Sequence, residues 1–193
     1  MTYGELKKRI YTLLDMDANA ESAVGSLNAL VRDAIIPTVN AVAARAAVPL
    51  RAIYKKADLY FEKDDLGVSA LLPTDVALVR EISKGSRRYG AVSFEKAGNI
   101  LYFFGAKEGF YTVGYYAFPR PLSDCLPDTA VLEMPDPVWN TIAYGVCAEL
   151  CTKVYPGDMK RYMRLSTEFD RRMTEQYPSS AVQNIRDAVF SRS

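Results

Sequence analysis

Histidine is absent from this 193-residue sequence. Because histidine is the commonest general base and a frequent metal ligand, its absence excludes Ser-His-Asp and Cys-His catalytic arrangements. The glycine motifs that bind phosphates are missing too, since the chain has neither GxxxxGK[ST] nor GxGxxG after a predicted strand. We therefore expect no enzyme, with no catalytic residues, no cofactor and no metal site.

Cysteine is scarce. The three cysteines, Cys125, Cys147 and Cys151, are odd in number and have no CxxC spacing. This pattern argues against a disulfide framework and against a thiolate metal site. Cys147 and Cys151 lie four residues apart in a predicted helix, so they share one face and are expected to be small core residues.

Neither sign of charge dominates, because 24 Lys and Arg balance 23 Asp and Glu to a net charge of +1. Proteins that read duplex DNA usually carry a clear basic excess, so sequence-specific DNA recognition is not expected. No apolar run reaches the roughly 20 residues that cross a bilayer, and residues 1–5 lack the order of a signal peptide. We expect a cytosolic chain with no membrane segment, long enough for one domain or for a domain with an insertion.

Helical patterns open the sequence. Thr2 and Glu5 have the capping-box spacing, which predicts a helix beginning there and fading near Asp15. A second apolar stripe at helical spacing runs over residues 20–47. Pro37 removes a hydrogen bond within this stripe, so we expect a kink or a break near Ile36.

Residues 50–118 instead alternate short β-branched and aromatic runs with Gly, Asp and Asn, which is typical of strands and turns. The expected strands are residues 52–62, 76–83, 91–95, 100–104 and 111–118. Turns at residues 97–99 and 106–109 predict hairpins, and a meander is the simplest topology.

Aromatic residues are unusually frequent in this stretch. They exceed what one sheet face needs to bury, so some should belong to an interface. The alternative is a two-sheet sandwich or a small barrel that buries both faces. The residues concerned are Tyr60, Phe61, Tyr89, Phe94, Tyr102, Phe103, Phe104, Phe110, Tyr111, Tyr115 and Tyr116.

The last third of the chain is helical again. Asp136 is expected to be the N-cap of a helix with Pro137 at its first position, followed after Pro156 by a second helix over residues 159–177. Together they form an α-hairpin. Residues 179–193 follow, and they are too short to stay helical without something on which to dock.

The fold class expected from these patterns is α+β. A helical bundle combines the N-terminal helices with the C-terminal α-hairpin, at residues 1–49 and 119–178. An antiparallel β-rich subdomain is inserted at residues 50–118, and residues 179–193 form a C-terminal arm.

Three phrases in this order resemble the head-to-tail adaptor (connector) proteins of tailed bacteriophages, including tail tubular protein A of short-tailed phages. They are GELKKR at residues 4–9, LPTDV at residues 72–76 and YYAFPRPL at residues 115–122. A polar loop, a proline-started helix with small residues and a helix rich in Arg, Glu and aromatics follow, as in that family. The likeness covers nearly the whole chain and rests on order and spacing, since each phrase alone is common.

The resemblance implies a structural virion protein made in the host cytoplasm and located at the neck of the virion. A homo-oligomeric ring of twelve subunits would bind beneath the portal protein, enclose the channel through which viral DNA is ejected, and offer its lower surface to tail proteins such as the nozzle or tail-completion protein. Contact with DNA would be non-specific proximity in the channel.

Two sets of residues are candidates for contacts with partners. The apolar side chains of the arm should pack on the portal or on a neighbouring subunit; they are Val182, Ile185, Val189 and Phe190. Arg87 and Arg88, in a predicted turn at residues 84–89, would touch phosphates in the channel or acidic portal residues, or simply form a solvated hairpin tip. Lys55 and Lys56 are interpreted as the outward side of a strand.

Two other readings remain. One is a carbohydrate-active, glycan-hydrolysing tail-associated protein, whose paired carboxylates would come from Asp64, Asp65, Glu95 and Glu108. The other is a small soluble α+β binding module.

Residues 64–72 and 123–133 lack periodicity. If the chain is an adaptor, these two segments are expected to gain order on binding.

Overall fold

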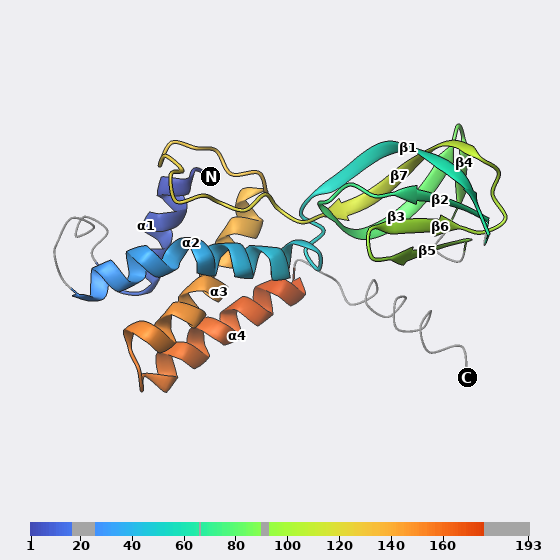
Figure 1. The fold of residues 1–193 in the computed structure, drawn as a ribbon. Helices are drawn as coiled ribbons and strands as arrows, with labels where there is room; N and C mark the ends of the chain where they lie inside the picture. The colour runs from blue at the N-terminus through green and yellow to red at the C-terminus, as the bar shows by residue number, and fades with distance from the viewer. Residues whose placement is uncertain (17–25, 66, 90–92, 176–193) are drawn as a thin grey trace, which may run out of the picture. The chain divides into compact units, whose positions relative to one another are not determined.

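A computed structural model describes residues 1–16, 26–65, 67–89 and 93–175. The chain is a mixed α+β protein, as expected, and it divides into two compact units. We call Met1–Leu50 with Pro121–Ser193 the helical unit, and Arg51–Arg120 the sheet unit (Figure 1). None of the helices within the described ranges is long and apolar enough to cross a membrane.

The central helix of the helical unit is α3, which is largely buried and contacts each of the other three described helices. It is apolar around most of its circumference, and Trp139, Ile142 and Leu150 are among its fully buried side chains. A helix that is apolar on nearly every side must be surrounded. The helices are α1 (Tyr3–Leu13), α2 (Ser26–Ala47), α3 (Asp136–Val154) and α4 (Met159–Glu175).

The predicted start of α1 is confirmed. The Thr2 hydroxyl accepts a hydrogen bond from the Glu5 amide at 3.2 Å, and the Glu5 carboxylate accepts one from the Thr2 amide at 2.7 Å. These two bonds satisfy backbone donors that a helix start leaves free. The helix then buries Leu6 and Ile10 completely.

Of the kink or break expected near Ile36, the break is wrong, because α2 continues through Pro37 to Ala47. Pro37 is exposed, whereas Ile35 and Val39 on either side are buried. The carbonyl that proline deprives of a partner, that of Asp33, lies on an exposed residue, where water can bind it. The apolar stripe therefore holds the helix together across the proline; its expected first turns, residues 20–25, lie outside the described residues.

The N-cap assigned to Asp136 is also wrong. Pro135 occupies that position without a side-chain cap, and Asp136 is the first helical residue. The Asp136 carboxylate instead accepts a hydrogen bond from the Met1 amino group. The α-hairpin itself is confirmed, since α3 and α4 pack against each other and Leu165 of α4 is buried.

The cysteines behave as expected. Cys147 and Cys151 are both buried, while Cys125 is exposed, and all three are free thiols. The Cys147 thiol lies 3.5 Å from the carbonyl oxygen of Ile10, which joins α3 to α1. Burial raises the pKa of the Cys147 thiol, so this group stays protonated and unreactive.

The sheet unit contains one antiparallel sheet of seven strands that curls into a half-barrel (Figure 1). The strand order is β4-β3-β7-β1-β2-β6-β5. The strands are β1 (Tyr54–Asp64), β2 (Gly67–Leu71), β3 (Val76–Lys84), β4 (Arg87–Tyr89), β5 (Phe94–Ala97), β6 (Ile100–Phe103) and β7 (Gly109–Ala117).

This topology is not the expected meander, because the last strand, β7, lies between β1 and β3. The hairpin expected at residues 106–109 is therefore wrong: β6 pairs with β2 and β5 instead. The hairpin at residues 97–99 is confirmed by the Ala97 to Ile100 pairing, and Gly98 adopts the positive φ of 61° that its turn requires. Strand β2 occupies most of residues 64–72, which were expected to be unordered before binding.

Aromatic side chains fill the concave side of the sheet. Phe61, Phe103 and Tyr111 are buried and meet edge to face, with ring centroids 5.2–6.0 Å apart. Tyr89 of the edge strand β4 meets the Phe103 ring of β6 at 4.9 Å, across the interior of the half-barrel. Of the alternatives considered, the two-sheet sandwich is not formed: a single sheet curves around the aromatic side chains, and part of the aromatic excess lies on its outer face.

Gly145 of α3 provides a first prediction. A Cβ at this position would lie 2.9 Å from both a Phe169 ring carbon and a Val42 methyl. Alanine adds up to about 1 kcal/mol of helix propensity, but forcing a methyl into a packed contact costs about 1–3 kcal/mol. We expect Gly145→Ala to destabilise the helical unit by about 1 kcal/mol net in urea unfolding followed by Trp139 fluorescence. The exposed substitution Lys153→Ala in the same helix should have almost no effect, and equal stabilities of the two variants would contradict the close contact.

Candidate interaction surfaces

The arm residues expected to contact partners, Val182, Ile185, Val189 and Phe190, lie outside the described residues. Arg87 and Arg88 are described, and they lie in strand β4 rather than in a turn. Arg88 pairs across the sheet with Ser83 and Arg87 with Lys84, so the two guanidinium groups leave opposite faces.

The two arginines consequently have different surroundings. The Arg88 side chain is 77% exposed and lies 4.0 Å from the Glu81 carboxylate on the outer face. The Arg87 guanidinium lies over the Tyr89 ring at 4.9 Å, on the side of the aromatic interior. A single basic tip acting as one unit is therefore not formed.

The outer face of the sheet carries a bridge over the central strand. The Tyr54 side chain of β1 crosses β7 at Gly114, and its hydroxyl donates to Glu81 of β3 at 2.8 Å. A Cβ at Gly114 would lie only 2.2 Å from the Tyr54 hydroxyl, so a larger residue at this strand position would displace the Tyr54 side chain. Burial and the bond to Glu81 raise the pKa of Tyr54, and the same bond lowers the pKa of Glu81.

The interpretation of Lys55 and Lys56 as one outward side is wrong, because consecutive strand residues alternate between faces. Lys56 is exposed, whereas the Lys55 ammonium lies 2.8 Å from a carboxylate oxygen of Asp75. The Tyr115 hydroxyl donates to the other oxygen at 3.3 Å. The bond from Lys55 holds the pKa of Asp75 below its usual range. Asp75 thus links residues 72–76 to residues 115–122.

A second contact between distant segments lies in the helical unit. The Asn40 side chain of α2 makes two hydrogen bonds to the backbone of Leu122, one to its carbonyl at 2.9 Å and one from its amide at 2.7 Å. This pairing satisfies both the donor and the acceptor of the amide side chain. The path of the chain into the helical unit is therefore fixed by α2.

The loop at residues 123–133 is already bonded to α1. The amides of Tyr3 and Gly4 donate to the carbonyls of Ala130 and Asp128, each at 2.9 Å. A Cβ at Gly4 would lie 3.0 Å from the Asp128 side chain, so glycine allows this close approach. Contrary to expectation, the loop does not need a partner to acquire these bonds.

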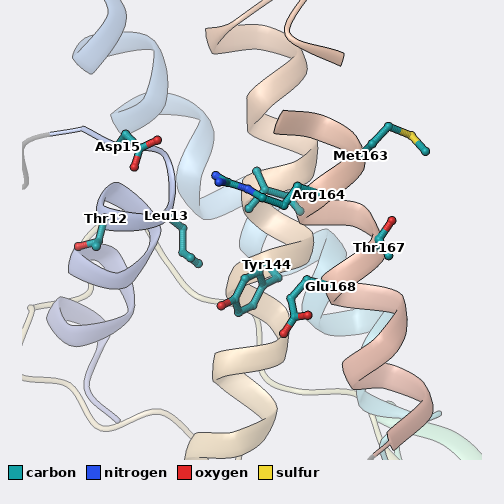
Figure 2. A pocket seen from close by; sticks show the side chains of 9 residues that line it. Thr12, Leu13, Asp15, Tyr144, Met163, Arg164, Thr167 and Glu168 are labelled. Atoms are coloured by element: carbon teal, nitrogen blue, oxygen red, sulfur yellow. The ribbon is translucent and has the colours of Figure 1, made fainter. Parts of the chain in front are cut away.

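A groove of about 690 Å³ runs between α1 and α4 with α3 as its floor (Figure 2). Tyr144 of α3 lies in it, and its ring is near the guanidinium groups of Arg9 (6.0 Å) and Arg172 (4.5 Å). The side chains that line the groove are Thr12, Leu13, Asp15, Tyr144, Met163, Arg164, Leu165, Thr167 and Glu168. The sequence did not predict this groove, because its residues come from three helices whose packing no spacing reveals.

Arginines surround Glu168 at one side of the groove. Arg171 and Arg172 each donate to its carboxylate at 2.6 Å. These bonds, that of Arg171 first, lower the pKa of Glu168 to about 2. The carboxylate is therefore charged at every physiological pH and already has its partners.

Within the described residues, no hydrogen bond joins any two of the four carboxylates proposed for glycan hydrolysis. Asp64 accepts from the Ser69 hydroxyl at 2.9 Å and Glu108 from the Tyr60 hydroxyl at 2.7 Å. Glu95 belongs to the edge strand β5, and Asp65 to the turn after β1. In the described ranges no three Asp, Glu or Cys residues are grouped so that they could hold a metal ion.

Asp75 gives a second prediction. Asp75→Asn removes a charged acceptor from Lys55 and Tyr115 and should destabilise the sheet unit by about 1 kcal/mol at neutral pH, in thermal unfolding followed by circular dichroism. Because the folded-state pKa is depressed, this stabilisation is present above the usual pKa of 3.8 and disappears as the pH falls below it. Asp65, exposed and in the same unit, supplies the control Asp65→Asn, and equal effects of both substitutions would contradict the role of Asp75.

Glu168 gives a third prediction. Its depressed pKa means that its ion pairs stabilise the fold fully above about pH 4.5 and lose that effect as the pH falls toward 2. Glu168→Gln should therefore lower the urea midpoint at neutral pH, and the gap to the parent protein should close in acid. Asp170→Asn, on the same helix and exposed, should show a smaller gap. A gap for Glu168→Gln that does not change with pH would refute the assignment.

No known protein family and no curated protein sequence matches this chain.

Proposed function

We propose that this chain is a structural adaptor between the head and the tail of a bacteriophage. It forms a ring below the portal protein, encloses the DNA channel and offers a surface to the tail proteins. The observation that carries the proposal concerns the phrases at residues 72–76 and 115–122, which characterise the resemblance to that family. They meet at Asp75, where the Tyr115 hydroxyl and the Phe118 amide bind its side chain and its carbonyl.

The remaining phrase has an equally local role. Residues 4–9 begin α1 with Gly4 against Asp128, and residues 115–122 end where Leu122 binds Asn40. Each of the three phrases thus makes contacts that hold together segments far apart in the sequence. These hydrogen bonds support the proposed resemblance.

The division of labour follows from the two units. We propose that the four described helices form a bundle that is the body of the ring, that the sheet unit is an inserted subdomain, and that residues 179–193 are the docking arm. The α+β order, with the sheet unit inserted between α2 and α3, supports this reading.

The surface of the sheet unit supports contacts with other proteins. Phe110 and Tyr60 are 66% and 44% exposed and meet edge to face at 5.0 Å, and Leu71 is 67% exposed. Large exposed apolar side chains that cluster on one unit indicate interaction sites. Arg88, beside this face, is the candidate for acidic residues of the portal or tail, and Arg87 for phosphates.

Electron microscopy of the purified chain with its portal ring tests the proposal. The wild-type chain should add a ring beneath the portal, and the chain lacking residues 179–193 should fold, by Trp139 fluorescence, but not bind. Failure of the wild type to form any ring would overturn the adaptor function.

Two further variants test whether binding depends on the apolar side chains of the arm or only on the presence of residues 179–193. Serine at positions 182, 185, 189 and 190 should abolish binding, whereas alanine at Gln183, Asn184, Asp187 and Ser191 should not. Equal binding by both variants, or by the truncated chain, would refute the docking arm while leaving the ring intact.

A further inference from the structure

One end of the helical unit exposes apolar and basic side chains together. At the start of α4, Met159 and Met163 are 65% and 54% exposed. Lys160 and Arg164 alternate with them. The side chain of neither makes a hydrogen bond or an ion pair with any residue that the structure describes. Methionine and arginine are enriched at protein interfaces, and the flexible methionine side chain adapts to different partners.

The groove continues this surface. Figure 2 shows Arg164 extending from α4 toward α1, above Leu13, while Met163 points outward from the rim. The two carboxylates that line the groove already have arginine partners: Asp15 lies 3.0 Å from Arg161, which also pairs with Asp158, and Glu168 binds two arginines. Among the described residues, Lys160 and Arg164 therefore leave positive charge for a partner. We call this surface, which comprises Leu13, Met159, Lys160, Met163 and Arg164, the basic end.

The other end of the helical unit has the opposite character. Residues 121–136 contain no Lys or Arg, and their carboxylates are Asp124, Asp128, Glu133 and Asp136. Lys7 lies 2.7 Å from Asp128, and the Met1 amino group pairs with Asp136. Val131, in the middle of this segment, is 81% exposed although it is large and apolar. We call residues 121–136 the acidic end.

Helix α1 separates the two ends. Its first amides, those of Tyr3 and Gly4, bind the acidic end, and the carbonyl of Leu14, just beyond its last turn, accepts from Arg161 and Tyr155 at the basic end. An 11-residue helix is about 16 Å long. The two complementary surfaces of one copy therefore cannot meet each other.

We propose that the basic end binds the acidic end of a second copy of this chain. Val131 of one copy packs between Met159 and Met163 of the next, and the surrounding carboxylates face Lys160 and Arg164. This inference rests on the proposed ring function and specifies the contact between neighbours. Two different surfaces joined head to tail leave both ends of the pair open, which is the arrangement that extends into a ring.

Sedimentation velocity of the full chain tests the contact with two charge-swapped variants. Met163→Glu with Arg164→Glu makes the basic end acidic, and Asp124→Lys with Val131→Lys makes the acidic end basic. Wild type should associate in a concentration-dependent way near 0.01 M salt, where the Debye length is about 30 Å, and much less near 1 M. Each variant alone should associate at least about tenfold more weakly, because like charges face each other.

An equal mixture of the two variants decides the matter. It should recover the association that each variant lacks, because every end then finds an oppositely charged one. The control Lys96→Glu, in β5 of the sheet unit, should associate like wild type. Far-ultraviolet circular dichroism and Trp139 fluorescence show that all variants are folded.

Several outcomes would overturn the inference: a wild type that stays monomeric at its solubility limit in low salt, a mixture that does not recover, or a Lys96→Glu variant that is equally impaired. Imaging the same proteins with portal separates the two proposals. Rings that form on the portal with all variants would refute this contact and leave the adaptor function standing. A wild type that associates head to tail but ignores the portal would do the reverse.

Discussion

The helical unit depends on the absence of a side chain at one point. Gly145 of α3 faces both α2 and α4, and a methyl group there would lie only 2.9 Å from Val42 and from Phe169. Because α3 is buried on nearly all sides, its contacts with α1, α2 and α4 determine where those helices lie. The groove is a result of this arrangement: α1 and α4 each pack on α3, and Tyr144 with its arginines occupies the space between them.

Local features of the fold could be predicted from the sequence. The Thr2 and Glu5 cap, the buried Cys147 and Cys151, and the hairpin at Gly98 each depend on residues a few positions apart. The continuity of α2 through Pro37 could not, because it depends on which side of the helix is buried. Strand pairing could not either: β7 is inserted beside β1 through contacts some fifty residues apart, such as Tyr60 with Phe110.

The candidate surfaces were predictable in part. The sequence singled out Arg87 and Arg88, but only the register of β4 shows that they face opposite sides. The absence of Lys and Arg from residues 121–136 is visible in the sequence, yet it has no meaning until the loop is placed against α1. Gly114 is similar, because the side chain that crosses it, Tyr54, belongs to another strand.

The first and last strands of the sheet unit begin and end side by side. Tyr54 of β1 pairs with Tyr116 of β7, and the Ala117 amide donates to the Ile53 carbonyl at 3.0 Å. Adjacent strands are about 4.8 Å apart, so a turn of a few residues would span the gap that the whole unit now fills. An insertion with such closely spaced ends behaves as an exchangeable cassette: its size and surface can diverge in evolution, or be replaced by design, without moving the helices that precede and follow it.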